Sequence, residues 1–279
     1  MTKICYLHVG LHKTASSSFQ GACAKNVDLL QENGVTYPLF SCSVANKSNI
    51  GNHSIPIFSL FMQKPENYHI NKRWGVSNDI KDVNSSYENQ LADYLASSDN
   101  LIISGEDISV LSEKSLFKLI DKIQNYNYEI KATALIRSPY SMICSAMQQR
   151  IKEGHYFNLI SLNNCVPTSI QVDKIAEKLI SVFGESIKSF AKSRIAEKLI
   201  SVFGESINFY SFDHACTHSH GPVGFLLTEF LSQVPSTFEY QTANESLSNL
   251  SVRIQNEFNA INPAFVGDKL NAQFREFPP

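Results

Sequence analysis

Residues 6–20 read YLHVGLHKTASSSFQ, a short apolar run that passes through a glycine and a lysine into a cluster of hydroxyl side chains. The apolar part belongs to ICYLHV (4–9), whose composition is typical of a buried strand. Apolar residues then recur at helical spacing, and a glycine is placed where the helix should end. These residues are Phe19, Cys23, Val27, Leu30 and the terminal Gly34. The stretch therefore predicts a strand, a turn and a helix in succession.

Three further segments resemble the first strand: LIIS (101–104), IKATALI (130–136) and INFYSF (207–212). Helical patterns lie between them, and this alternation predicts an α/β fold with a central parallel sheet flanked by helices. Ligands of such sheets bind at the carboxyl ends of the strands. We therefore look for function in the residues that directly follow each strand.

Composition excludes several classes of protein. The chain has 279 residues, a net charge of -2 and a pI near 6.4, so no general affinity for nucleic acid is expected. The six cysteines are scattered without a CxxC pair, which predicts reduced thiols and a cytoplasmic location. No apolar run reaches membrane-spanning length, and the first one is too short for a signal peptide.

We expect a single domain over residues 1–279, with a polar insertion at about 41–90 that is rich in Asn and Ser. One segment, IAEKLISVFGESI, occurs at 175–187 and again, without a change, at 195–207. A shift of 20 residues would turn a continuous helix by about 200°, so the helix must break, and Gly184 is the expected place. Two copies do not make a solenoid, and we interpret them as a local tandem duplication with no function of its own.

The turn after the first strand is suited to an anion. A strand-to-helix turn offers backbone amides and a helix N-terminus, and Lys13 adds a full positive charge. Hydroxyl donors surround it, and Ala15 is small enough to let a ligand approach. The hydroxyl residues are Thr14, Ser16, Ser17 and Ser18. Helix capping would need one hydroxyl and would not explain the lysine. The spacing of a Walker A loop and the GxGxxG fingerprint are both absent.

Two segments together resemble PAPS-dependent sulfotransferases, in particular bacterial members that act on carbohydrates. HVGLHKTASSSFQ resembles their 5′-phosphosulfate-binding loop, and ALIRSPYSMICSAMQQ (134–149) resembles their 3′-phosphate-binding segment, in which Ser145 follows Arg137 by eight residues. LIISGEDIS and ANESLSNLSVRIQNEFNAIN are weaker matches in the same order. The resemblance implies a P-loop-NTPase-like sheet and 3′-phosphoadenylyl sulfate (PAPS) as the donor.

The resemblance also implies roles for residues. Lys13 would stabilise the leaving phosphate, residues 14–18 would bind the 5′-phosphate, and Arg137 with Ser145 would bind the 3′-phosphate. The loop departs from the family pattern in having His12 for proline and serines for two threonines. It also has Ala15 for glycine, which is tolerable only if residue 15 has a negative φ.

Transfer to a hydroxyl needs a general base. Two residues are candidates: His53 in the polar insertion, which we place first, and Glu106 directly after the second strand. His12 could contact the donor or only fill the place of proline.

The cluster DHACTHSH (213–220) has metal-ligand spacing, but the implied chemistry needs no metal, and we interpret it as a polar loop.

The sequence thus predicts a sulfotransferase that moves a sulfuryl group from PAPS to an acceptor hydroxyl by in-line displacement. A saccharide acceptor is favoured by the resemblance and by Tyr68, Trp74 and Tyr87, which could stack on sugar rings. The alternatives are a P-loop small-molecule kinase and a nucleotide-binding or scaffold relative without turnover.

Overall fold

The computed structural model describes residues 2–11, 13–137, 145, 148, 151–152, 154, 194–240, 249–261, 265–266 and 269–270. It divides the chain into two compact units, one formed by residues 1–137 and 193–244 and the other by 138–192 and 245–279. The single domain over residues 1–279 stays a prediction.

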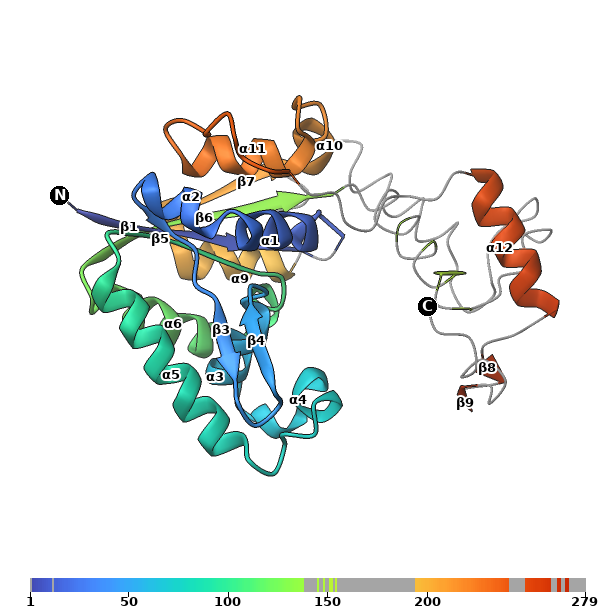
Figure 1. The fold of residues 1–279 in the computed structure, drawn as a ribbon, viewed down its shortest axis with the longest axis horizontal. Helices are drawn as coiled ribbons and strands as arrows, with labels where there is room; N and C mark the ends of the chain where they lie inside the picture. Colours follow the sequence, from blue (N-terminus) through green and yellow to red (C-terminus); the bar gives the residue numbers. More distant parts are fainter. Residues whose placement is uncertain are drawn as a thin grey trace. The chain divides into compact units, whose positions relative to one another are not determined.

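The first unit is built on a five-stranded parallel sheet in the order β2-β5-β1-β6-β7 (Figure 1). Its strands are β1 (Lys3–Val9), β2 (Val35–Thr36), β5 (Asn100–Gly105), β6 (Tyr128–Ile136) and β7 (Ile207–Ser211). The predicted α/β class, with a central parallel sheet flanked by helices, is confirmed. Because β1 lies in the middle and the chain crosses from its β5 side to its β6 side, the end of β1 is a topological switch point.

Helices cover both faces of this sheet (Figure 1). One face packs against α1 (Ser16–Lys25), α10 (Phe212–Ala215) and α11 (Gly221–Phe230), and the opposite face packs against α5 (Ile80–Ser97), α6 (Glu113–Gln124) and α9 (Arg194–Phe203). Successive side chains of β1 point to opposite faces of the sheet. Cys5, Leu7 and Val9 pack in the core beneath α5 and α6, and Tyr6 packs on the face covered by α1. Every core strand is therefore buried on both sides, as its apolar sequence predicted.

The predicted first helix is interrupted. It forms as α1 and a separate α2 (Val27–Glu32), with Asn26 between them. The Asn26 side chain donates to the Ala22 and Glu239 carbonyl oxygens, so a contact distant in sequence fixes the break. Gly34 has φ 77°, in keeping with its predicted place at the end of the helix.

The polar insertion forms several short helices and also a hairpin that the sequence did not predict. Its elements are β3 (Phe40–Cys42), β4 (Lys47–Ile50), η1 (Ser54–Phe58), α3 (Ser59–Phe61), η2 (Pro65–Asn67) and α4 (His69–Arg73). Several polar side chains of the insertion are buried and paired: Asn71 donates to the Ser59 hydroxyl, which donates to Asn84. Much of the insertion is thus part of the core.

The second copy of the repeat forms α9, η6 (Gly204–Ser206) and the first residue of β7. Its glycine, Gly204, has φ 55° and lies where the helix ends. The first copy and Gly184 lie outside the described residues. η3 (Asp107–Val110) follows β5.

The second unit contains α12 (Asn249–Ile261) and the short pair β8 (Phe265–Val266) and β9 (Lys269–Leu270). Asn259 of α12 is buried and donates to the Ile151 carbonyl oxygen, 2.8 Å away. None of the helices in the described ranges has both the length and the apolar character needed to cross a bilayer.

Candidate anion-binding site

The turn between β1 and α1 has an unusual backbone. Lys13 and Ala15 adopt the left-handed conformation, with φ 67° and 62°. Ala15 therefore does not meet the condition, a negative φ, under which alanine is a tolerable replacement for the glycine of the sulfotransferase pattern. Left-handed residues in a turn point successive N–H groups toward one side and form a concave site for anions. Strain of this kind persists where surrounding structure holds it, often at functional sites.

Close packing holds the turn against β5. A Cβ added at Gly10 would lie 2.5 Å from the Ser16 hydroxyl oxygen and 3.2 Å from the Glu106 Cα atom. Glycine at position 10 thus allows the start of α1 and the end of β5 to approach each other. Ser16 and Glu106 therefore both lie against the position that a side chain at residue 10 would occupy.

The hydroxyl residues of the turn do not cap α1. Ala15 occupies the N-cap position, no side chain caps the helix, and its first turn contains no acidic residue. Thr14 donates within the turn to the Leu11 carbonyl oxygen, 2.5 Å away. Ser16 Oγ is buried and has no hydrogen-bond partner among the described residues, whereas Ser17 is exposed. The helix N-terminus and Ser16 therefore match the anion interpretation better than the capping alternative.

The second predicted segment meets this turn at Arg137, the residue that follows β6. The guanidinium Nη1 donates to the Lys13 carbonyl oxygen at 2.9 Å, and its central carbon lies 4.7 Å from the centre of the Phe212 ring. β6 is hydrogen-bonded to β1, so the sheet itself places these residues together. The structure thus brings Lys13 and Arg137, 124 positions apart, to one edge of the sheet.

Glu106 follows β5 at the same edge and occupies the N-cap position of η3. Its carbonyl oxygen accepts from the Ser109 hydroxyl at 2.8 Å, and its side chain is half-buried. Its negative charge acts to raise the pKa of His8, although burial has the larger effect on that ring and lowers its pKa to about 4. Glu106 is thus close enough to His8 to interact with its ring electrostatically.

His53 does not share this position. It is fully buried, its Nε2 lies 2.7 Å from the Pro38 carbonyl oxygen, and its Nδ1 accepts from the Ser104 backbone N–H at 2.9 Å. Those contacts require a neutral ring protonated on Nε2, and burial lowers its pKa to about 4. Neither nitrogen is available to an acceptor in this arrangement. His53 instead joins the insertion to β5, and Glu106 is the better placed of the two candidate bases.

Sequence reasoning missed a buried polar cluster below the turn. His8 Nδ1 lies 2.8 Å from the Ser104 hydroxyl, and the two residues pair across β1 and β5. Gln20 of α1 donates to the Ser104 carbonyl oxygen, whereas His8 Nε2 has no partner within the described ranges. The sequence offered one signal for this cluster: His8 and Ser104 are polar residues near the ends of two otherwise apolar strands.

His12 lies outside the described residues, and Ser145 is helical and half-buried in the second unit. Tyr68 and Tyr87 are buried in the first unit, which removes them as platforms for a sugar, and Trp74 packs partly against the same core.

The histidine-rich loop is engaged in local contacts. Ser211 caps α10, His214 packs against Phe225, and His220 stacks on Tyr240 at 3.9 Å between ring centres. Within the described part of the chain, no group of three or more His, Cys, Asp or Glu side chains is arranged to bind a metal.

Comparisons with known proteins add little. No protein-family model and no curated protein matches the chain. A solved structure from a study of the PezAT chromosomal toxin–antitoxin system of Streptococcus pneumoniae aligns over 94% of this chain and 86% of its own, with 11% identity and a TM-score of 0.34. That similarity is too low to support an argument about fold or function.

Proposed function

We propose that the chain binds a 3′-phosphorylated adenine nucleotide at the edge formed by β1, β5 and β6, and that it is a PAPS-dependent sulfotransferase. The observation that supports this most directly is the hydrogen bond from Arg137 to the Lys13 carbonyl oxygen. It joins the two segments that resemble the 5′- and 3′-phosphate-binding parts of that family.

The chemistry asked of these residues is modest. In an in-line transfer the sulfur–oxygen bond to the leaving phosphate breaks while a sulfur–oxygen bond to the acceptor forms. Lys13 and the N–H groups at the start of α1 would stabilise the charge on the leaving phosphate. Glu106 would take the proton of the acceptor hydroxyl.

Arg137 is suited to the 3′-phosphate because its planar guanidinium can form two parallel hydrogen bonds to one anion. Its contact with the Phe212 ring restricts its orientation, which lowers the entropy lost on binding. Ser145 is a further proposed contact of this phosphate. A saccharide acceptor remains a proposal from the family resemblance.

One observation favours a second candidate, a nucleotide-binding relative without turnover. Ala15 has φ 62° where the family pattern has glycine, so a methyl group is present in a turn that must approach the phosphosulfate closely. Such a protein would bind the nucleotide and transfer nothing.

Calorimetric titration of the full chain with 3′-phosphoadenosine 5′-phosphate, ATP and 5′-AMP tests the binding site. We expect the 3′-phosphorylated nucleotide to bind most tightly, and Lys13→Ala to weaken it about 10- to 100-fold, since charge-assisted bonds contribute about 1.5–3 kcal/mol. Lys72→Ala, at an exposed lysine of α4, is the matched control and should change nothing. Equal binding of ATP would contradict the proposal.

Incubation with PAPS and a panel of saccharides separates the two candidates. Release of 3′-phosphoadenosine 5′-phosphate that depends on an acceptor supports the enzyme. Tight nucleotide binding without release across the panel supports the non-catalytic relative.

A further inference from the structure

The helix α9 and the start of β7 are made entirely from the second copy of the repeat, apart from Arg194. The residues that this copy buries in the core all have a counterpart 20 positions earlier. They are Ala196, Leu199, Val202, Phe203 and Ile207. The counterparts are identical in type because the two 13-residue segments are identical. The apolar surface that receives α9, formed by η3, α6 and the sheet, is therefore complementary to either copy.

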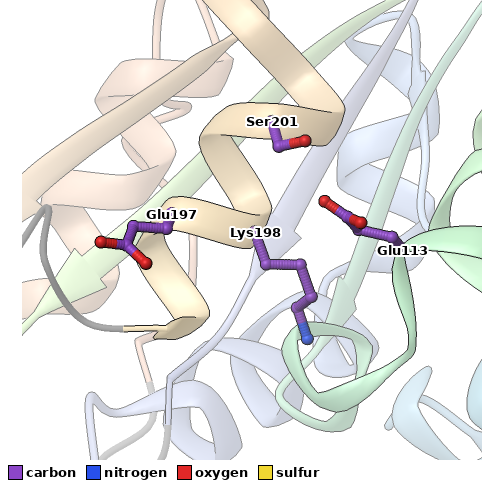
Figure 2. Close-up of a pocket in the computed structure, with 4 residues that line it drawn as sticks. All are labelled: Glu113, Glu197, Lys198 and Ser201. Atoms are coloured by element: carbon purple, nitrogen blue, oxygen red, sulfur yellow. The ribbon is translucent and has the colours of Figure 1, made fainter.

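Polar contacts of α9 also lie within the repeat. Lys198 donates to the Ser109 and Leu111 carbonyl oxygens, each 2.7 Å away, and burial lowers its pKa. Figure 2 shows its side chain extending from α9 toward the segment that carries Glu113. Three of the four residues that line the groove there, Glu197, Lys198 and Ser201, belong to the repeat. Lys178 is the counterpart of Lys198 and could make the same two hydrogen bonds.

We propose that this surface is a docking surface for both copies, so that residues 175–187 and 195–207 compete for it. The residues immediately after each copy decide the competition. After Ile207, β7 continues with Phe209, which packs on the sheet face covered by α5, α6 and α9. Tyr210 packs on the opposite face, and its hydroxyl donates to the Glu229 carboxylate. After Ile187 the corresponding residues are Ser189 and Phe190. The second copy is favoured because serine cannot replace the packing of Phe209.

Exchange would alter the edge of the sheet where Arg137 lies. Phe212 follows Ile207 by five positions and supports the Arg137 guanidinium, whereas Lys192 follows Ile187 by five positions. Docking of the first copy would place the Lys192 ammonium at the sequence position that the Phe212 ring now occupies. This consequence for nucleotide affinity rests on the proposed function, whereas the exchange itself does not.

Matched substitutions test the exchange in the full chain. Leu199 is fully buried, so Leu199→Asp should prevent the second copy from docking, because a carboxylate cannot be buried there without a partner. Leu179→Asp is the same change in the first copy. The control is a chain with a single copy of the repeat. Deletion of residues 175–194 and deletion of residues 188–207 give the same sequence, so only one such chain exists. It is made with and without the Leu→Asp change in its one copy.

The readout is lysine acetylation followed by trypsin digestion and mass spectrometry, beside thermal unfolding. The sequence after each copy differs, with Lys188 after Ile187 and Asn208 after Ile207, so the peptides that contain Lys178 and Lys198 are distinguished by mass. With Leu179→Asp we expect Lys198 to stay protected and unfolding to match wild type. With Leu199→Asp we expect a lowered but cooperative transition, with protection lost at Lys198 and gained at Lys178. An unprotected Lys178 in Leu199→Asp would overturn the proposal, whatever the nucleotide measurements show.

Discussion

The left-handed backbone at Ala15 makes a direct prediction about stability. A non-glycine residue in this conformation is disfavoured by about 1–2 kcal/mol, and Ala15 has φ 62° and ψ 20°. Ala15→Gly should remove that strain, while the greater freedom of glycine in the unfolded chain offsets about 0.4–1 kcal/mol of the gain. Glycine is also a better N-cap residue than alanine. The expected result is a net stabilisation of about 0.5–1 kcal/mol.

Thermal unfolding followed by circular dichroism measures this gain. For a unit of this size, about 1 kcal/mol corresponds to roughly 2–4 °C, so Ala15→Gly should raise the midpoint by about 1–4 °C. The control is Ala92→Gly, inside the helix α5, which should lower stability by about 1 kcal/mol. A lowered midpoint for Ala15→Gly, similar to that of the control, would refute the assigned backbone at the turn.

Three further predictions concern the surroundings of the turn. Gly10→Ala should destabilise the protein by about 1–3 kcal/mol in urea unfolding, because its Cβ would lie 2.5 Å from Ser16 Oγ and 3.2 Å from Glu106 Cα; an unchanged midpoint would contradict this packing. His53→Ala should cost about 3 kcal/mol or more, since it leaves the Pro38 carbonyl and the Ser104 N–H buried without partners; a loss below about 1 kcal/mol would argue against the two bonds. Burial lowers the pKa of His8 and His53 from 6.5 to about 4, so the stability due to their neutral rings is present above pH 6.5 and is lost as the pH falls toward 4. Unfolding midpoints measured across that range should fall less steeply in His8→Gln than in wild type, and parallel curves would count against a buried neutral His8.

The core strands could be predicted because their composition reports burial on both faces. The predicted segments 4–9, 101–104, 130–136 and 207–212 match β1, β5, β6 and β7 to within about two residues at each end. The two-residue β2 and the hairpin of β3 and β4 escaped prediction because they are short and their sequences are mixed. Their pairing depends on neighbours rather than on local pattern.

The site was only partly predictable. Lys13 and Arg137 could be placed together because both follow neighbouring parallel strands, a rule that holds for any such sheet. The structural use of His53 was not visible, because its partners Pro38 and Ser104 lie 15 and 51 positions away. The left-handed backbone of Ala15 was not visible in the sequence, because the preference of alanine for negative φ is overridden by the packing of Gly10, Ser16 and Glu106.

The most direct test of the proposed site compares the affinities of two nucleotides for wild type and for one variant, beside a control variant. Affinities of 3′-phosphoadenosine 5′-phosphate and 5′-AMP are measured by calorimetry on wild type and Arg137→Ala, with the exposed Arg73→Ala as control. If Arg137 binds the 3′-phosphate, its loss should weaken the first ligand about 10- to 100-fold and leave 5′-AMP and the control nearly unchanged. Equal weakening of both ligands, or no preference for the 3′-phosphate in wild type, would contradict the account.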